Sequence, residues 1–472
     1  MPSTIVTINP TTGAELARYP AMSPEQIDAA LDTAAAAQRA WAGEDFTVRA
    51  EILRVAAELL RERDDELALL VTREMGKPLA ESVAEVHKCA DGLEFYAEHA
   101  PGFLAEEVYV TAADRSWVSY EPVGVVLAVM PWNFPLWQVF RFAAPALMAG
   151  NAALLKHSPN TTGAALMCQD ILSAAGLPDG LFTALVVAEP DVPTTTERLI
   201  ADPRVGAVTI TGSERAGSAV GSIAGREIKK SVLELGGSDP FIVLADADLP
   251  RVANLAVKGR FLNAGQSCIS PKRFIVEASV AEEFTRLVVE HTVALTVGDP
   301  EAPDTNVGPM ARRDLRDGVA DQVRAAVEGG ATLLCGGSPR DDLGGFFYQP
   351  TVLGDVHKGM SVYAEEVFGP VATIITVADA DEAVTVANDT PFGLGASVWS
   401  RDVDAALAVG KRVTSGACFI NSIVASDARM PFGGTKRSGY GRELAGPGIR
   451  EFVNIRTWWA MNEPQADAPA SE

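Results

Sequence analysis

Cys268 is the residue whose type and surroundings first suggest chemistry. It lies in the stretch NAGQSCIS, residues 263–270, among small and polar residues rather than large apolar ones. A cysteine in such surroundings could be a nucleophile, because the thiolate is the reactive form of the side chain. It could also be an ordinary free cysteine, since free cysteines are among the most buried residues. The stretch alone leaves both interpretations open.

Glu234 and Asn133 also lie where a polar side chain is unexpected. Glu234 stands between Leu233 and Leu235, directly before two glycines. Burial among apolar groups raises the pKa of a carboxyl group, which suits a general base near neutral pH. A glutamate paired with a nearby lysine is the alternative. Asn133 follows a buried-looking strand in MPWNFPLW, residues 130–137, where asparagine can also simply form a turn.

A strand that leads through a glycine turn into a helix predicts a phosphate site. In AVTITGSERAG the strand ends at Gly212 and Ser213, and the helix contains Gly217. Unpaired N–H groups and the helix dipole favour phosphate there, although a plain turn capped by serine is equally consistent. No GxGxxG fingerprint follows a strand, and the segment lacks the Lys and Ser/Thr of a P-loop. Lys156, at the end of AALLK, could reach a ribose or phosphate or be merely solvated.

Alternating helices and strands must position these residues. Residues 24–100 have helical spacing of apolar residues, and 106–121 are predicted to form a hairpin with its turn at Ala113 and Asp114. Strand-like runs then alternate with helices, which predicts an α/β fold with a mostly parallel sheet covered on both faces. The length of 472 residues indicates two or three domains. The predicted strands are 124–130, 152–156, 182–187, 207–211, 241–245, 273–277 and 371–377, with a helix over 280–296.

Composition and charge argue against several classes of protein. The 62 acidic and 39 basic residues give a net charge of −23, so neither nucleic acid nor an anionic membrane is expected as a partner. The cysteines are five in number without a CxxC pair, so neither a disulfide framework nor a zinc site is expected. No histidine metal motif, signal peptide or long apolar run occurs, and we expect a cytoplasmic protein without a catalytic metal.

Six motifs together resemble the NAD(P)-dependent aldehyde dehydrogenase superfamily. They occur in the family's order over nearly the whole chain: PWNFP, TGS, LELGG, GQSC, EEVFGP and PFGGTKRSGYGRE. Each is a weak match alone, but their common register is not expected by chance, and Glu234 and Cys268 are 34 residues apart as in the family. LLKHSPN and SDARMPFGG are similar to a bacterial branch of succinate-semialdehyde dehydrogenases.

The resemblance implies catalytic roles for the three polar residues. Cys268 would attack the aldehyde carbon, and Asn133 with the backbone N–H of Cys268 would form an oxyanion hole. Glu234 would activate water against the thioester. The implied cofactor is NADP or NAD, with Ser213 at the pyrophosphate, Lys156 at the adenosine ribose and Glu366 at the nicotinamide ribose. The full set of implied cofactor contacts is Lys156, Gly212, Ser213, Gly217, Pro131, Trp132, Glu366 and Phe368.

Two positions bear on specificity. Pro159 stands three residues after Lys156, where many NAD-preferring members have a glutamate that repels the 2′-phosphate of NADP. We therefore expect both cofactors to be used, with a preference for NADP. Arg141, eight residues after Asn133, is also arginine in succinate-semialdehyde dehydrogenases. It could bind the distal carboxylate of the substrate, or it could pair with an acidic residue.

Other substrate contacts of the family are only partly present. Phe134 and Phe432 are expected substrate contacts. Leu262 and Ala445 stand where well-studied succinate-semialdehyde dehydrogenases have arginine and serine. Arg429 or Ser426 could supply the missing contacts.

The resemblance also implies the architecture and the function. Residues 1–104 and 122–235 would form a Rossmann-type dinucleotide-binding domain, 236–440 an α/β catalytic domain, and 105–121 with 449–460 a protruding oligomerisation part. A hairpin is unstable alone, so a homodimer or homotetramer is expected. The predicted function is oxidation of an aldehyde, above all succinate semialdehyde, to the carboxylate. A broad-specificity aldehyde dehydrogenase, a CoA-acylating relative and a non-enzymatic member are the alternatives, and Glu234 argues against the CoA-acylating one.

Overall fold

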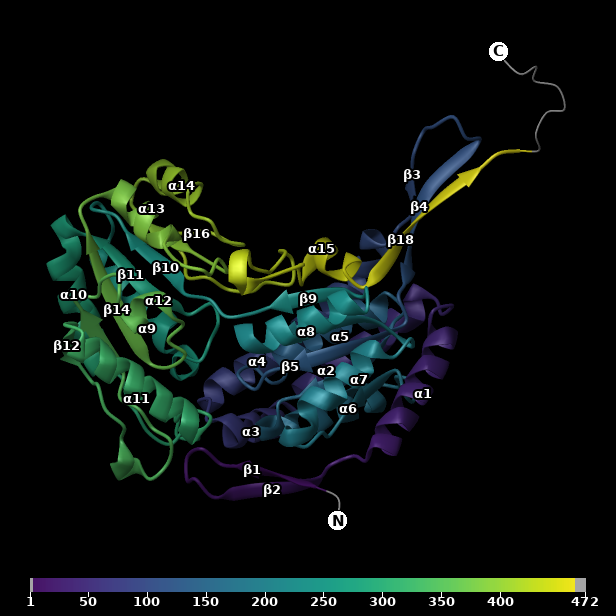
Figure 1. Ribbon diagram of the computed structural model, residues 1–472, viewed down its shortest axis with the longest axis horizontal. Coiled ribbons are helices and arrows are strands. Elements are labelled where there is room, and N and C mark those ends of the chain that lie inside the picture. Colours follow the sequence, from purple (N-terminus) through teal and green to yellow (C-terminus); the bar gives the residue numbers. More distant parts are fainter. Residues whose placement is uncertain (1–2, 463–472) are drawn as a thin grey trace.

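Two separate sheets carry most of the apolar strands in the computed structural model, which describes residues 3–462 (Figure 1). The first sheet has six strands in the order β17-β9-β8-β5-β6-β7. All of its strands are parallel except the edge strand β17, which is antiparallel to β9. Their bounds are β5 (Val125–Met130), β6 (Ala152–His157), β7 (Phe182–Ala184), β8 (Val205–Thr211), β9 (Lys230–Glu234) and β17 (Gly439–Tyr440).

The second sheet has seven strands in the order β12-β13-β14-β11-β10-β15-β16. Only β12 runs antiparallel to its neighbour. The strands near its centre are almost fully buried, as expected when helices cover both faces of a parallel sheet. Their bounds are β10 (Asp239–Val243), β11 (Pro271–Glu277), β12 (Thr332–Cys335), β13 (Thr351–Gly354), β14 (Val371–Val377), β15 (Ser397–Trp399) and β16 (Phe419–Ile420).

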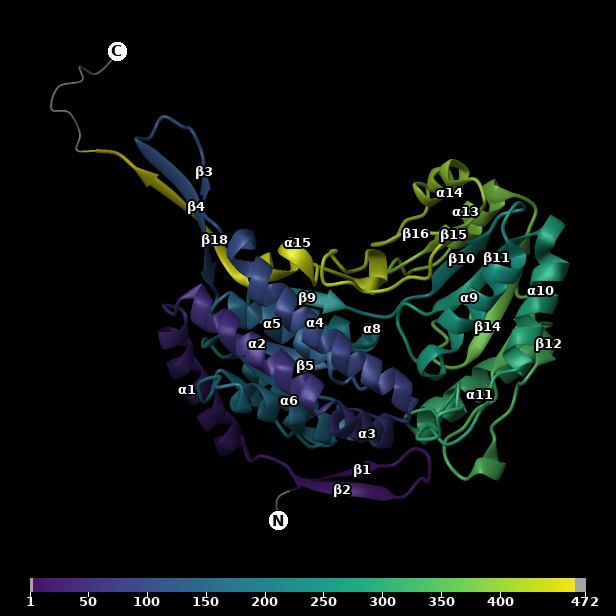
Figure 2. The same cartoon turned by 180° about the vertical axis from the view of Figure 1, so that it is seen from behind.

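Helices cover both faces of the first sheet. Figure 1 shows α7 and α8 in front of it, and Figure 2 shows α2 and α4 in front when the molecule is seen from behind. The first helix illustrates why they form: Ser23 and Gln26 make a reciprocal capping box, and Ile27 and Leu31 lie on one buried face. The helices on this sheet are α1 (Pro24–Trp41), α2 (Phe46–Glu62), α3 (Asp64–Met75), α4 (Leu79–Phe103), α5 (Trp137–Met148), α6 (Thr162–Ala174), α7 (Val192–Ala201) and α8 (Glu214–Arg226).

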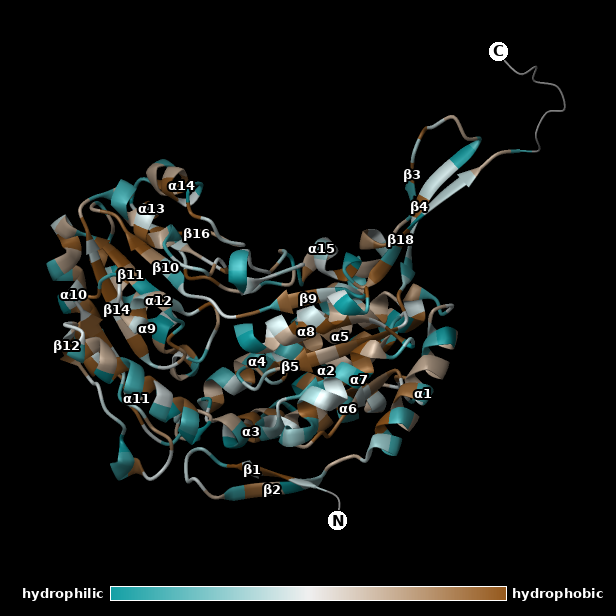
Figure 3. Cartoon of the chain, in the orientation of Figure 1, coloured by the Kyte–Doolittle hydropathy of each residue, from teal (hydrophilic) through white to brown (hydrophobic). Residues whose placement is uncertain are grey.

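The remaining helices belong mainly to the second sheet. Its buried strands are strongly apolar, while the outward faces of its helices are mixed in polarity (Figure 3). These helices are α9 (Leu249–Phe261), α10 (Ala278–Val293), α11 (Arg313–Glu328), α12 (Ser361–Ala364), α13 (Ala380–Asn388) and α14 (Val403–Gly410), while α15 (Ala445–Arg450) packs on α4 and α5. Short 3₁₀ turns cover Pro159–Thr161, Glu189–Asp191, Leu262–Gly265, Asp341–Leu343 and Lys436–Ser438.

A three-stranded antiparallel sheet projects from the body (Figure 1). Strand β4 (Arg115–Pro122) pairs with β3 (Glu107–Val108) on one side and along its full length with β18 (Val453–Ala460) on the other. The rings of Trp117 and Trp458 stack across this pair with centroids 5.5 Å apart. A separate hairpin of β1 (Thr4–Ile8) and β2 (Glu15–Pro20) lies at the opposite end of the molecule.

The α/β class, the hairpin at 106–121 and the helix near 280–296 are confirmed. The strand predicted over 182–187 was too long, because β7 ends at Ala184. Strand β9 was not predicted, and it carries Glu234 at its end. The domain boundaries stay a prediction: β10 begins the second sheet at Asp239, but β17, within the predicted catalytic segment, joins the first sheet.

Candidate active site

Cys268 lies in a backbone segment of unusual conformation between α9 and β11. Asn263, Ala264 and Gly265 follow one another with φ values of 53°, 53° and 71°. Left-handed conformations are costly for residues with a Cβ, so the surrounding structure must stabilise them. Glycine is required at Gly265, because a Cβ there would meet the backbone of Gly369. The loop is therefore held in one shape that the neighbouring strands impose.

Arg260, near the end of α9, is a cation that holds this loop in place through hydrogen bonds. Its side chain is completely buried, and its guanidinium connects the Cys268 segment to the backbone of residues 367–371. Five donors in a fixed planar fork suit such a role. The acceptors are Gly265 O (3.3 Å), Val367 O (2.9 Å), Gly369 O (2.6 Å), Val371 O (2.5 Å) and Ser270 Oγ (2.8 Å).

Lys272, on β11, is a second buried cation beside the thiol. Its Nζ donates to Ser267 O at 2.7 Å and to Cys268 O at 2.5 Å, and it lies 3.3 Å from a carboxylate oxygen of Glu366. Burial raises the pKa of the Cys268 thiol to about 11, and Lys272 and Arg141 offset part of that rise. The resting thiol is therefore protonated at neutral pH and needs a base to become a nucleophile.

Asn133 is brought to the Cys268 loop by reciprocal hydrogen bonds. Its Nδ2 donates to Gln266 O at 3.1 Å, and Asn263 Nδ2 donates to the Asn133 carbonyl at 2.8 Å. Gln266 in turn accepts from Ala311 N at 3.0 Å, which anchors the loop to the segment before α11. The amide of Asn133 is buried and adjoins the loop that carries the thiol, and its role in an oxyanion hole stays a prediction.

Glu234 lies at the carboxyl end of β9 in a buried position. Within residues 3–462 neither carboxyl oxygen has a hydrogen-bond partner. Burial raises the pKa of Glu234 well above its ordinary value, and the nearby Glu443 carboxylate raises it further, while Arg141 and Arg442 act in the opposite direction. The raised pKa agrees in direction with the sequence prediction, and no lysine of residues 3–462 pairs with Glu234.

Arg141, on α5, is already paired. It forms an ion pair with Glu443 in which both side chains are buried, and Nη2 donates to Thr211 Oγ1 at 3.2 Å. Its guanidinium carbon lies 5.0 Å from the centre of the Phe432 ring. The sequence left two possibilities open for Arg141, a substrate carboxylate or an acidic residue of the protein, and the structure shows a pair with an acidic residue.

A cavity of about 270 Å³ opens onto Cys268. Its lining includes Glu81, Ala84 and Lys88 of α4 and the segment from Ile423 to Ser426. The rest of its lining is largely apolar and aromatic, as is usual for a small-molecule site. Among the predicted residues, those that line it are Cys268, Arg141, Phe134, Phe432, Leu262 and Ser426, whereas Glu234, Asn133, Ala445 and Arg429 do not.

The predicted cofactor residues gather at the carboxyl ends of β6 and β8, the position where open parallel sheets bind ligands. Ser213 caps α8 by accepting from Ala216 N at 3.3 Å, and Gly217 leaves no room for a Cβ against Leu235. Lys156 is buried without an ion-pair partner in the described chain, and burial lowers its pKa to about 8. The backbone N–H groups at the N-terminus of α8 could bind a phosphate, and the ammonium of Lys156 could bind a phosphate or a ribose.

The residues predicted at the nicotinamide end also lie near one another. Gly237 N donates to Glu366 Oε1 at 3.0 Å, which directs that carboxylate to the β9–β10 connection. The rings of Trp132 and Phe368 meet edge to face at 5.8 Å, and Pro131 precedes Trp132 directly after β5. The structure thus brings together strands β5, β9 and the segment before β14.

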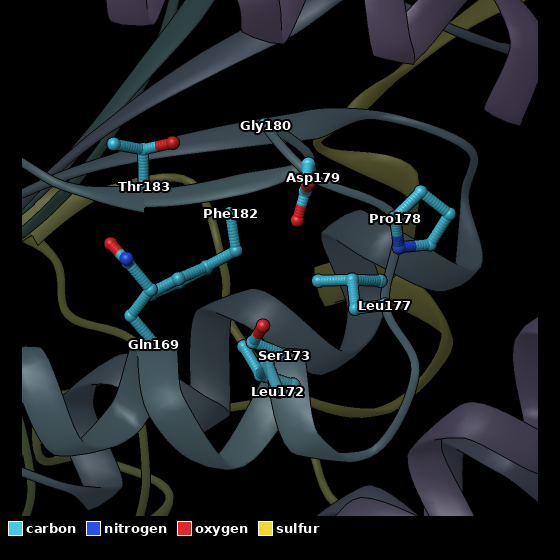
Figure 4. A pocket seen from close by; sticks show the side chains of 9 residues that line it. All are labelled: Gln169, Leu172, Ser173, Leu177, Pro178, Asp179, Gly180, Phe182 and Thr183. Atoms are coloured by element: carbon cyan, nitrogen blue, oxygen red, sulfur yellow. The ribbon is translucent and has the colours of Figure 1, made fainter.

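A second, smaller pocket lies away from these residues. Its volume is about 80 Å³, and it lies between α6 and the start of β7, where Gln169, Asp179 and Thr183 supply its polar groups (Figure 4). It contains neither a thiol nor a cation, and it is too small for a nucleotide. We assign it no role in the chemistry at Cys268.

Three further observations bear on the predicted classes. Within residues 3–462 no cluster of His, Cys, Asp or Glu could hold a metal ion, and no helix there has the length and apolarity to cross a membrane. All five cysteines are free. The cytoplasmic location stays a prediction.

The sequence did not identify Arg260, Lys272, Glu443 or Lys88 as parts of the site. A basic residue inside an amphipathic helix or next to a strand usually lies in solvent, so its type alone carries no signal. Glu443 lies within PFGGTKRSGYGRE, one of the six quoted motifs, and that position was the available clue. Lys88 lies one helical turn after Glu85 on α4, and only the fold shows that this face borders the cavity.

Comparison with known proteins agrees with the arrangement of these residues. The profile of the aldehyde dehydrogenase family matches residues 1–458. The chain belongs to the aldehyde dehydrogenase family. This aldehyde dehydrogenase is 49% identical over 458 residues to succinate-semialdehyde dehydrogenase NADP(+) 1 of Mycobacterium tuberculosis, which covers 96% of this chain and 99% of the relative. It is 48% identical to a probable succinate-semialdehyde dehydrogenase NADP(+) of Synechocystis, over 96% and 99% of the two chains.

Solved structures of aldehyde dehydrogenases show the same fold. Succinic semialdehyde dehydrogenase from Streptococcus pyogenes, in complex with NADP+, is 36% identical with a TM-score of 0.94, over 97% of this chain and 100% of that one. Succinate-semialdehyde dehydrogenase from Burkholderia pseudomallei is 34% identical with a TM-score of 0.93, over 97% and 94% of the two chains. The predicted family and fold are confirmed.

Proposed function

We propose that this aldehyde dehydrogenase oxidises succinate semialdehyde to succinate with NADP+, and NAD+ less well. The observation that carries the proposal is the cavity that opens onto Cys268 and brings cationic groups to its walls. A substrate with an aldehyde at one end and a carboxylate at the other fits such a cavity. The similarity to NADP(+) succinate-semialdehyde dehydrogenases at 48–49% identity supports the same substrate and cofactor.

In the first step the thiol of Cys268 attacks the aldehyde carbon and a thiohemiacetal forms. The thiol proton must be removed, because burial holds the pKa of Cys268 at about 11. Glu234 is proposed to accept this proton. Water or substrate in the site would make its surroundings more polar and so favour the ionised carboxylate that acts as the base. Asn133 Nδ2 and the backbone N–H of Cys268 are proposed to donate to the alkoxide oxygen, and one such donor contributes roughly 3 kcal/mol.

The residues at the ends of β6 and β8 fit a dinucleotide. Lys156 supplies a buried cation without an acidic partner in the described chain, and Ser213 leaves the N-terminus of α8 open to phosphate. Pro159 presents no carboxylate toward a 2′-phosphate. When bound, NADP+ accepts the hydride of the oxidation. We propose that Glu366 and Phe368 hold the nicotinamide end, because Glu366 is fixed by Lys272 and Gly237.

In the last step water hydrolyses the thioester on Cys268. Glu234 is proposed to take a proton from that water, and burial, which raises its pKa, makes it a stronger base than an ordinary carboxylate. The products are succinate and the free thiol, and the net reaction consumes one water and releases two protons.

Steady-state kinetics with aldehydes of two to eight carbons, succinate semialdehyde included, test the proposal with both cofactors. We expect the highest kcat/KM with succinate semialdehyde and NADP+. Equal kcat/KM with a neutral aldehyde would indicate a broad-specificity enzyme, and equal or better kcat/KM with NAD+ would remove the cofactor preference. No aldehyde-dependent NADPH or NADH formation over the whole panel would favour a non-enzymatic member of the family.

We also propose that the projecting sheet joins two subunits into a dimer, or four into a dimer of dimers. Apolar side chains on it are exposed, among them Val108, Val110, Ile455 and Trp459. Three strands from one chain already pair, so the partner would cover their apolar faces or free edges rather than complete a lone hairpin. Size-exclusion chromatography with light scattering at micromolar concentration tests this, and a monomer throughout would contradict it.

A further inference from the structure

Lys272, on β11, places a buried charge against the backbone that carries the thiol. Its side chain is only 1% exposed. Each of its three ammonium donors has an acceptor, namely Ser267 O at 2.7 Å, Cys268 O at 2.5 Å and Glu366 Oε1 at 3.3 Å. Burial of a charge is costly unless the charge is paired and hydrogen-bonded. Two carbonyls of the thiol segment therefore take the place that water would have around this ammonium.

These two carbonyls belong to a β-turn whose central residues are Cys268 and Ile269. Ser270 N donates to Ser267 O at 3.2 Å, which closes the turn. In a trans peptide the N–H points opposite to the C=O, so the N–H groups of Cys268 and Ile269 point away from Lys272. Within the described chain neither N–H donates to another atom. Both are available to a ligand in the cavity that these residues line.

The peptide group between Ser267 and Cys268 connects the ammonium to the chemistry. Its oxygen accepts from Lys272, and its N–H is the proposed donor to the alkoxide. A cation at the oxygen of an amide favours the resonance form in which electron density leaves the nitrogen. Hydrogen bonds joined through one polar group also strengthen one another, most of all where the dielectric constant is low. The Cys268 N–H should therefore be a stronger donor than an ordinary amide.

The surroundings fix Lys272 at both ends. Thr373 Oγ1 donates to the backbone carbonyl of Lys272 at 2.6 Å, which joins β11 to β14. At the other end, Gly237 lets the turn pack directly on the β9–β10 connection, because a Cβ there would lie 2.8 Å from Cys268 O. Gly237 N also donates to Glu366 Oε1 at 3.0 Å. The ammonium therefore has one defined position beneath the turn.

Charges of both signs face the thiol, and they bear on how the role of Lys272 can be tested. Burial has the largest effect and raises the pKa of Cys268 to about 11. Lys272 and Arg141 act against this rise, whereas Glu366 and Asp239 add to it. Loss of Lys272 would thus make the thiol a weaker acid as well. A test must separate an effect on the thiol from an effect on the N–H.

We propose that Lys272 is a positioning residue that directs the Cys268 N–H toward the substrate oxygen and strengthens it as an oxyanion donor. The inference rests on the proposed function, because it concerns the same thiohemiacetal step. Asn133, the other proposed donor, is held separately by Gln266 and Asn263. Loss of the Lys272 ammonium therefore weakens one donor of two and should slow the reaction without abolishing it.

Three reactions of Cys268 separate the two effects. Iodoacetamide alkylates the thiolate without forming an alkoxide, whereas oxidation of succinate semialdehyde and cleavage of 4-nitrophenyl acetate both pass through an oxyanion. In the ester reaction the sulfur bonds to the acetyl carbon, 4-nitrophenolate leaves with the electrons of the broken C–O bond, and the thiol proton passes to a base. Water then hydrolyses the thioester, and no cofactor is needed. Cys268→Ala supplies the background rate of each reaction.

In Lys272→Met we expect kcat of both oxyanion reactions to fall at least tenfold, which corresponds to about 1.4 kcal/mol. KM for succinate semialdehyde and for NADP+ should change less than threefold, as for an interaction made only in the transition state. Alkylation at pH 8 should fall less than threefold, so the ratio of either oxyanion rate to the alkylation rate falls more than threefold. Lys272→Arg, which keeps the charge, should recover most of the loss, and Lys272→Gln, a neutral donor, should lie between.

Arg273→Met is the matched control, because Arg273 is the next buried cation on the same strand. Its guanidinium donates to the carbonyls of Ser238, Val386 and Ala387, none of which lies in the Cys268 turn. This variant should lower Tm but leave the ratio of ester cleavage to alkylation within twofold of the wild type. An equal fall of that ratio in Arg273→Met and Lys272→Met would mean that loosening of β11 is the cause, and it would overturn the inference.

The outcomes distinguish this inference from the proposed function. An equal fall in alkylation and in both oxyanion reactions would limit Lys272 to the charge of the thiol and overturn the inference. A rise in KM for NADP+ with unchanged kcat would do the same, because Lys272 would then act through Glu366 alone. If the wild type oxidises no aldehyde, the proposed function is wrong, and the ratio of ester cleavage to alkylation still decides the inference. If Lys272→Met does not fold, an unchanged ratio in Lys272→Gln overturns it.

Discussion

Replacement of Arg141 by methionine tests whether this residue serves the fold or the substrate. In the structure its guanidinium neutralises Glu443, and both side chains are almost completely inaccessible to solvent. Removing one partner leaves the other charge buried and unpaired, which costs about 3–5 kcal/mol. For a folding unit of about 250 residues, 1 kcal/mol corresponds to about 2 °C, so we expect Tm to fall by roughly 6–10 °C.

The pH dependence of that loss has a definite sign. Without Arg141 the pKa of Glu443, which burial already raises, rises further in the folded protein. The folded state then binds a proton more tightly than the unfolded chain, so the stability of Arg141→Met falls as pH rises above the unfolded pKa of about 4.3. The difference in Tm from the wild type should therefore be smaller at pH 5 than at pH 8.

Differential scanning calorimetry of three proteins measures both effects. The double variant Arg141→Met with Glu443→Gln contains no uncompensated charge and should recover most of the lost Tm. A single variant with unchanged Tm and a selective rise in KM for succinate semialdehyde would refute this reasoning, because it would mean that Arg141 serves the substrate rather than Glu443.

Three other changes have expected results at the same site. Glu234→Gln should slow both removal of the thiol proton and hydrolysis of the thioester, and so lower the steady-state rate of NADPH formation at least 100-fold; an unchanged steady-state rate would contradict the role of Glu234. The rate of Cys268 alkylation by iodoacetamide should rise about tenfold per pH unit from pH 7 to 10, since burial raises the pKa of the thiol to about 11; a plateau below pH 8 would contradict this. Pro159→Glu should lower kcat/KM with NADP+ about tenfold relative to NAD+, because a carboxylate would then oppose the 2′-phosphate; an unchanged ratio would show that this position does not face the phosphate.

The strands that the sequence predicted well are those with continuous apolar runs. Strands β5, β6, β8 and β14 are nearly all apolar and buried, so periodicity and length identified them. Strand β9 begins with Lys230 and Ser231 and ends with Glu234, and this short, half-polar pattern carries no strand signal. It forms because β8 and β17 flank it in the sheet, which is tertiary context that local pattern does not contain.

At the site, too, features set by neighbouring residues could be predicted, and contacts between segments far apart in the sequence could not. Cys268 and Glu234 could be assigned because motifs around each of them are short and contiguous. The pairing of Arg141 with Glu443 depends on α15 and the preceding segment folding back against α4 and α5, far along the chain. The sequence left the partner of Arg141 open for that reason, and only the folded chain decides which carboxylate it meets.

The partners of the buried and partly buried cations near Cys268 separate structural roles from ligand binding. Lys272 donates to two carbonyls of the Cys268 loop, and Arg260 joins Gly265 O of that loop to the carbonyls of Val367 and Gly369, so both hold a backbone conformation that would otherwise be costly. Arg141 has a carboxylate of its own, because its Nε pairs with Glu443 and its Nη2 donates to Thr211 Oγ1. Lys88 lines the cavity, and its Nζ donates to Ser426 Oγ beside the Trp137 ring. A buried cation whose donors end on backbone carbonyls serves the conformation of the loop, so the cations that remain open to the cavity are those on α4 and α5.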